Sequence, residues 1–306
     1  MSLTQTVMNM KSANAQFYNY WNKSLASFKY ANRATHLSHA RESVLRWWWE
    51  YLKLSKDYWL LCQTCSPGRP ETTDKRLARV FKAFGNIHAQ NFDKWWVTTG
   101  YMLFGEVDGP AEVRLHLPGR PLIPQNNWGS LLVEIPLSLS KKTITERIHE
   151  ILNEHEDQRP SSWLGASKAE FPVNPVRFRV PTLRTTHDVY CQHQMLIVRP
   201  RLKHGDDYEV PDIFNLGKML NINYSNTRLG SESNENAKKR NRVRATVGRY
   251  ITRANLLIQN VEIGTFPVFK PVEVQKRFTT KQLKHFERFE EKWLALKVGS
   301  ELNKDK

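Results

Sequence analysis

The chain contains little cysteine and no long apolar run. Three cysteines among 306 residues leave one thiol unpaired in any pairing scheme, so a disulfide framework is not expected and a reducing cytoplasm fits better. No stretch approaches the roughly 18 uninterrupted apolar residues of a membrane-spanning helix. The first residues also lack the apolar segment of a secretory signal. We therefore expect a cytoplasmic protein with no membrane partner.

The sequence also lacks the short motifs of several common enzyme classes. It contains no phosphate-binding G-x4-G-K-[ST], no dinucleotide-binding G-x-G-x-x-G and no G-x-S-x-G nucleophile turn. Cys62 and Cys65 form one C-x2-C pair, but a zinc site needs two more ligands. Cys191 with His193, or His88, would supply them only through folding. We expect reduced thiols, no metal, no cofactor and no enzymatic activity.

One acidic group lies near the end of an expected helix. Its members are Glu150, Glu154, His155, Glu156 and Asp157. Because a loop is expected beside this helix end, a solvated acidic patch is the preferred interpretation. Carboxylates dispersed along the chain would also suit a metal-dependent nuclease, which is the least favoured of the three functions considered.

Acidic side chains are scarce relative to basic ones, and the formal net charge is +16. Residues 1–110 carry 14 basic and 8 acidic side chains, residues 111–233 carry 15 and 14, and residues 234–306 carry 17 and 8. The positive excess therefore lies at the two ends of the chain. A concentrated positive field attracts polyanions, and this excess is larger than solubility requires. The charge predicts a nucleic-acid partner, DNA rather than RNA.

The apolar content of 40% and the ten tryptophans indicate a folded protein. We predict a mainly α, α+β chain in three parts. An aromatic helical domain covers residues 1–108, a mixed α+β region covers 109–210, and a basic helical region covers 211–306.

In the aromatic part, helical spacing of apolar residues predicts helices over 38–61 and 74–84 and a third that begins after Asn91. The side chains of Trp47, Trp48 and Trp49 point about 100° apart on such a helix, so one stripe cannot bury all three. Either neighbours cover the helix on several sides or one tryptophan faces a partner. We favour a compact aromatic core over base stacking for the tryptophans, including Trp95 and Trp96.

The mixed region has a strand candidate at 130–139, followed by a helix at 141–154 that Ser140 caps. Residues 190–198 fit either a strand or a short helix. In the last region, a helix starts after Asp212, and another covers 279–296.

Residues 236–262 carry the most informative pattern of the chain. An apolar stripe recurs every three or four residues, and it includes Val243, Val247 and Ile251. Seven cations occupy the other faces with no acid among them. They are Lys238, Lys239, Arg240, Arg242, Arg244, Arg249 and Arg253. Arginine suits fork-shaped contacts with phosphate or guanine, so this helix is the predicted nucleic-acid contact.

Three interpretations of the basic helix remain open. With the helix at 212–220 it has the outline of a helix-turn-helix reader, although the connection of about 15 residues exceeds the tight turn of that motif. It is alternatively a looser contact with a groove or the backbone, or a solvated surface helix. Further basic residues in the centre of the chain extend the predicted track. They are Arg177, Arg179, Arg199, Arg201 and Lys203.

One segment resembles a known family. Residues 48–58, WWEYLKLSKDY, are similar to the opening of bacterial "transcriptional regulator-like" domain proteins of mobile elements, and residues 133–138, VEIPLS, resemble a later strand–helix unit there. Leu54 and Ser55 depart from the pattern, which has Arg and Asn at these positions. The resemblance implies a bacterial, DNA-associated setting and transfers no functional residue.

The sequence as a whole predicts a non-enzymatic DNA-binding regulator or accessory protein of a bacterial mobile-element or phage-related system. Its basic helix would contact the phosphate backbone, and its location would be the nucleoid. The alternative is a structural or adaptor subunit of a larger nucleoprotein assembly, in which exposed tryptophans bind protein partners or a second copy of the chain.

Overall fold

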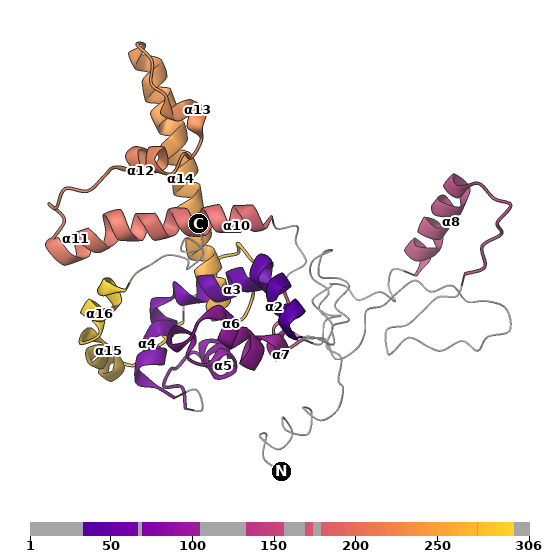
Figure 1. Cartoon of the computed structure of the whole chain (residues 1–306), viewed down its shortest axis with the longest axis horizontal. Coiled ribbons are helices and arrows are strands. Elements are labelled where there is room, and N and C mark those ends of the chain that lie inside the picture. Colours follow the sequence, from indigo (N-terminus) through magenta and orange to yellow (C-terminus); the bar gives the residue numbers. More distant parts are fainter. Residues whose placement is uncertain are drawn as a thin grey trace. The chain divides into compact units, whose positions relative to one another are not determined.

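The structure is a computed structural model that describes residues 33–66, 69–104, 133–155, 169–173, 179–273 and 275–296. The chain divides into two compact units: Met1–Asn32 with Phe104–Pro175, and Arg33–Leu103 with Val176–Lys306. The second unit groups segments that lie at opposite ends of the sequence (Figure 1). The protein is mainly α, and the described residues form no β-strand.

In the first unit, helix α8 (Lys141–Glu154) confirms the predicted helix. Ser140 caps it, because its hydroxyl oxygen accepts a hydrogen bond from the backbone N–H of Thr143 at 3.2 Å. The predicted strand before it is wrong for residues 133–139, which form an irregular segment and a turn. Pro136 has no N–H to give to a strand ladder, and the Leu137 side chain is 95% exposed. Residues 130–132 lie outside the described part.

The regular elements that the structure describes in the second unit are helices. They are α2 (Arg33–Glu42), α3 (Val44–Lys53), α4 (Lys56–Thr64), α5 (Lys75–Phe84), the 3₁₀-helix η1 (Ile87–Ala89), α6 (Phe92–Trp95), the π-helix η2 (Trp96–Gly100), α7 (Tyr101–Leu103), α10 (Val180–His193), the π-helix η4 (Gln194–Val198), α11 (Arg199–His204), α12 (Ile213–Met219), α13 (Tyr224–Thr227), α14 (Ser233–Glu262), α15 (Thr280–Glu287) and α16 (Glu290–Ala295).

Two serines divide the long helix expected at 38–61 into α2, α3 and α4. The Ser43 hydroxyl oxygen accepts from the N–H of Leu45 at 3.1 Å, and the Ser55 hydroxyl oxygen accepts from the N–H of Tyr58 at 3.0 Å. Each serine therefore starts a new helix, although the apolar periodicity continues across it. The helix at 74–84 is confirmed as α5, and a helix does follow Asn91, as predicted.

The three consecutive tryptophans of α3 are all buried because neighbours cover this helix on several sides. The rings of Trp47 and His187 of α10 lie 5.4 Å apart, and the rings of Trp49 and Phe92 of α6 lie 5.7 Å apart. Trp48 lies 6.1 Å from Phe84 of α5. The predicted aromatic core is confirmed, and these rings are not available to stack on bases.

Residues 190–198 are helical, which decides the ambiguity left by their sequence pattern. They belong to one continuous rod that runs from α10 through η4 into α11 (Figure 1). Pro200 is the second residue after η4. Its ring would crowd the preceding turn of an α-helix, and the wider turn of a π-helix relieves that crowding.

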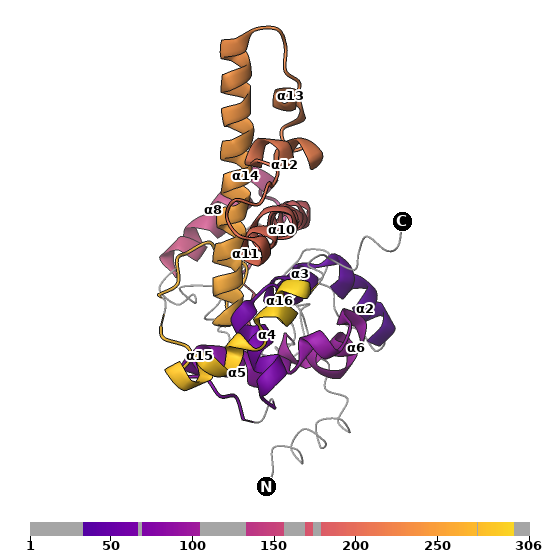
Figure 2. The ribbon, with the colours of Figure 1, turned by 90° about the vertical axis from the view of Figure 1, so that its left-hand side faces the viewer.

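Helix α14 is the central element of the C-terminal segment. Its C-terminal half contacts α3 and α10, and its N-terminal half contacts α12 and α13 (Figure 2). Val243 and Val247 are fully buried against α12. A Cβ atom on Gly217 would lie 2.4 Å from a methyl carbon of Val243, so the close approach of α12 requires glycine at this position.

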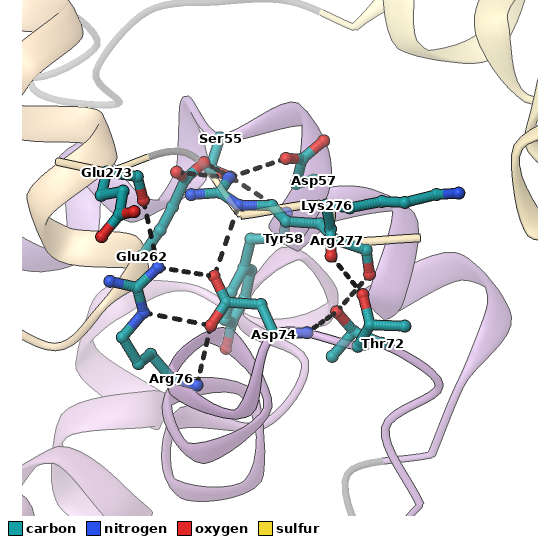
Figure 3. Close-up of polar contacts among 11 residues, drawn as sticks. Ser55, Asp57, Tyr58, Thr72, Asp74, Arg76, Glu262, Glu273, Lys276 and Arg277 are labelled. Carbon is teal, nitrogen blue, oxygen red and sulfur yellow. Dashed lines mark hydrogen bonds and ion pairs between the residues drawn. The ribbon is translucent and has the colours of Figure 1, made fainter. Parts of the chain in front are cut away.

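A buried polar network fixes the C-terminal end of α14 (Figure 3). The Arg277 guanidinium donates to carboxylate oxygens of Glu262 and Asp57, each at 2.7 Å, and Ser55 also bonds to Glu262. Burial raises the pKa of Glu262, while Arg277 and Ser55 act in the opposite direction. Removing one partner of such a buried pair leaves an uncompensated charge, so the network holds α14 firmly to α4.

The helix predicted at 279–296 is two helices, α15 and α16. Thr279 and Gln282 form a capping box at the start of α15. The break before α16 lets Phe286 pack on Phe278, with ring centroids 4.8 Å apart, while Trp293 contacts Trp59 at 5.4 Å. A straight helix would not direct both aromatic side chains into these contacts.

Candidate nucleic-acid interface

Helix α14 confirms the predicted basic helix and extends it to 30 residues, Ser233–Glu262. The expected apolar stripe faces α12 and the core, as the burial of Val243, Val247, Ala254 and Val261 shows. Six of the seven cations fall into two rows around the helix axis. At 100° per residue, Lys238, Arg242, Arg249 and Arg253 fall within about 60° of one another, while Arg240 and Arg244 lie on the opposite flank.

The first group, Lys238, Arg242, Arg249 and Arg253, is called the outer row. All four side chains are exposed. At 1.5 Å per residue they span about 22 Å along the axis. Among the described residues, none of the four forms an ion pair with a carboxylate.

The contacts that the outer row does make leave its charges accessible. Arg249 donates to the Ala245 carbonyl oxygen at 3.4 Å and to the Thr246 hydroxyl oxygen at 3.3 Å, both on its own helix. The Arg253 guanidinium carbon lies 5.6 Å from the centroid of the exposed Phe269 ring. These weak contacts orient the side chains without neutralising them.

The second group, Arg240 and Arg244, is called the inner row, and side chains of α12 contact it. Lys239 lies between the two rows, about 40° from Arg253 around the helix axis. Arg244 pairs with Asp212 at 2.7 Å, and Lys239 pairs with Glu235 at 3.2 Å. The Arg240 guanidinium carbon lies 5.3 Å from the centroid of the Phe214 ring. Arg244 also lowers the pKa of Asp212, because its guanidinium donates a hydrogen bond to the Asp212 carboxylate. The inner row therefore attaches α12 to α14.

The predicted basic residues in the centre of the chain also include one that the protein buries and others that stay exposed. The expectation that Arg199 extends the track is corrected, because its side chain is only 8% exposed and donates to the backbone carbonyl oxygens of Leu294 and Leu296. Its guanidinium carbon also lies 5.2 Å from the centroid of the Trp293 ring. Arg179, Arg201 and Lys203 are exposed at the two ends of the α10–α11 rod. Arg177 lies outside the described residues.

The connection between α12 and α14 differs from a helix-turn-helix. The motif joins its two helices by three or four residues. Here the segment from Leu220 to Glu232 contains α13. Asn223, the residue before α13, has the left-handed backbone conformation with a φ of 57°. The arrangement is a helical hairpin in which α12 lies against α14, and the outer row faces away from α12.

The three cysteines are free thiols in different surroundings. Cys62 and Cys191 are buried free thiols and Cys65 is half-buried. Burial raises the pKa of Cys62 to about 12, so this thiol stays protonated. Within the described ranges, no group of three or more His, Cys, Asp or Glu side chains could hold a metal ion.

The predicted acidic patch is solvated where the structure describes it. Glu150 and Glu154 are exposed on α8, and Arg147 pairs with Glu150 at 2.5 Å. Glu156 and Asp157 lie outside the described part.

Among the helices that the structure describes, none combines the length and the apolar character that crossing a membrane requires.

Comparison with family models, with curated proteins and with solved structures finds no match to this chain. The resemblance of residues 48–58 to regulator-like proteins of mobile elements therefore stays a prediction. In this structure the conspicuous residues of that segment, Trp48, Trp49 and Tyr51, are core residues with no exposed surface.

Proposed function

We propose that the protein binds nucleic acid, duplex DNA in the first instance, through the outer row of α14. The observation that carries the proposal is the exposure of Lys238, Arg242, Arg249 and Arg253 without a carboxylate partner in the described part of the chain. Like charges four residues apart on a helix destabilise it, so two such pairs in one row are a cost in the free protein. A phosphate backbone removes that cost.

The dimensions of the row suit a duplex. Its span of about 22 Å is shorter than one turn of B-DNA, which is about 34 Å, so a single groove accommodates the whole row. Between the cations the exposed surface carries small residues, Asn241, Ala245 and Thr252. Small side chains let a phosphate backbone approach the helix closely.

The role that we propose is non-enzymatic: a regulator or accessory factor that acts on DNA, with the nucleoid as the location. The direct test is fluorescence anisotropy with labelled duplex DNA, single-stranded DNA and RNA at two salt concentrations. We expect the tightest binding to the duplex and a steep loss of affinity with salt. The absence of binding to all three ligands at 50 mM salt would refute the proposal.

A second candidate, an adaptor subunit of a nucleoprotein assembly, is favoured by exposed apolar side chains in unit 2. Leu202 is 64% exposed, Met219 is 61% exposed and Tyr224 is 54% exposed. Such side chains are typical of protein interfaces when they form a contiguous patch. Gel filtration with light scattering tests this candidate, which requires self-association or a co-purified protein partner.

A further inference from the structure

The second unit contains a cavity of about 420 Å³ that no sequence motif indicated. Its lining comes from three separate parts of the chain: α3, α4 and η1; the α10–η4–α11 rod; and α16. Cavities of this size bind small organic molecules, and this one has room for a single nucleotide-sized ligand. Among the residues that line it, Gln63 and Lys292 are exposed, and Trp59 and His187 are buried.

The charges of the lining are predominantly positive. Lys53, Lys292 and Arg199 contribute three cations, and Glu50 is the carboxylate of the lining. The side chain of Glu50 is already paired with Arg46 at 2.5 Å, and both side chains are buried. The cavity therefore favours an anion, because its cations are not neutralised from within.

Two buried nitrogen atoms in the lining have no hydrogen-bond partner among the residues that the structure describes. They are Nε of Arg199, whose residue is more than nine-tenths buried, and Nε2 of His88. Burial and the positive charge of Lys53 lower the pKa of His88 to about 3, so its ring is neutral. An unsatisfied buried polar atom destabilises the protein, and a polar ligand that bonds to it removes this cost.

The π-helix η4 positions two of the polar groups. Gln194 opens η4 and Arg199 follows it directly, and both side chains line the cavity. The wide turn shifts the register of the rod between them. Single π-turns within α-helices occur frequently at functional sites. Aromatic walls complete the cavity, since Trp59 and Trp293 both border it.

From these features we infer that the cavity is a binding site for one nucleotide, a planar base that carries a phosphate. The rings of Trp59 and Trp293 provide apolar surface for the base, and the amides of Gln63 and Gln194 provide donors and acceptors for its edge. Lys53, Lys292 and Arg199 face the phosphate. A free nucleotide and a nucleotide of a single strand share this chemistry. The site is separate from the outer row of α14.

Isothermal titration calorimetry of the full chain tests the site with adenosine and guanosine 5′-monophosphates, the two nucleosides, inorganic phosphate and a short single-stranded oligonucleotide. NMR of the tryptophan indole N–H groups locates the binding. We expect the monophosphates to bind and to shift the resonances of Trp59 and Trp293. Competition between the oligonucleotide and the monophosphate would assign the natural ligand to a strand, and its absence would assign it to a free nucleotide.

The variants avoid Arg199, which the fold needs. Lys292→Gln is expected to weaken monophosphate binding about two- to fivefold, the range of a partly exposed ion pair. Lys284→Gln on the exposed surface of α15 is the matched control, with no expected change. Arg242→Gln must leave monophosphate binding intact, which separates this site from the proposed DNA contact. The inference is overturned if no monophosphate binds at millimolar concentration, or if nucleosides or inorganic phosphate bind as well as the monophosphates do.

Discussion

The double variant Arg242→Gln/Arg249→Gln tests the proposed DNA contact most directly. Both guanidinium groups are exposed in the outer row and have no carboxylate partner among the described residues. Glutamine keeps much of the side-chain length and the helix propensity and removes only the charge. The variant Lys281→Gln/Lys284→Gln is the matched control, because it removes two exposed positive charges from α15.

Counterion release gives the size of the expected effect. Each phosphate neutralised by the protein contributes about 0.9 to the slope of log K against log salt concentration. Loss of two contacts should lower the steepness by about 1.8. The same relation gives an affinity loss of about 60-fold at 0.1 M salt and about 20-fold at 0.2 M salt. The control should change the slope by much less, since long-range charge alone is screened beyond about 10 Å.

The assay is a salt titration of duplex binding by fluorescence anisotropy for the wild type and both double variants. Thermal unfolding of the same samples checks folding, and we expect nearly equal midpoints because surface changes of this kind cost little stability. If the outer-row variant and the control have the same slope and affinity, α14 is not the contact. A loss shared equally by both variants would mean that net charge, rather than this row, attracts DNA.

Three further predictions concern α12, His88 and Asp212. Gly217→Ala should destabilise the protein by about 1–3 kcal/mol through overpacking against Val243, measured by urea unfolding. The pKa of His88 is about 3 in the folded protein and about 6.5 in the unfolded chain. As the pH falls, the unfolded state therefore binds the proton first. The contribution of the neutral ring to the free energy of unfolding is present above pH 6.5 and falls by about 2 kcal/mol between pH 7 and pH 5. His88→Gln should remove this part of the pH dependence, and an unchanged pH profile would contradict the assignment. Asp212→Asn retains a capping side chain but releases Arg244 from its ion pair. Duplex affinity should therefore rise, and the free energy of unfolding should change by less than about 1 kcal/mol. A fall in duplex affinity would contradict this prediction.

Local signals in the sequence identify many helix ends correctly. Asn91, Ser140 and Asp212 accept backbone hydrogen bonds where their positions before apolar periodic segments predict caps. Helix breaks inside a periodic segment are harder to predict. Ser43 and Ser55 start new helices because tertiary contacts favour a change of direction there, and the apolar spacing does not show it. The strand predicted before Ser140 failed because alternation alone supplies no neighbouring strand for pairing.

The basic helix and the cavity also differ in how far the sequence predicts them. The basic helix could be predicted because its cations and its apolar stripe share one continuous segment. The division into two rows depends on Asp212 and Phe214, which α12 brings beside α14, and Arg199 could not be excluded without the backbone carbonyl oxygens of α16. The cavity lining comes from segments more than 200 residues apart, so no local pattern contains it.

The contacts that hold the rest of α14 in place also determine the geometry of the outer row. The network of Arg277 and Glu262 fixes its C-terminal end, and the contacts of Gly217 with Val243 fix α12 against its N-terminal half. These interactions offset the repulsion within the outer row and keep its four cations at defined spacing in the free protein. The backbone of α14 is therefore ordered during folding rather than on binding, which lowers that part of the cost of binding. A fixed row of this kind favours a ligand with regularly spaced charges, which a duplex backbone has and an acidic protein surface generally does not.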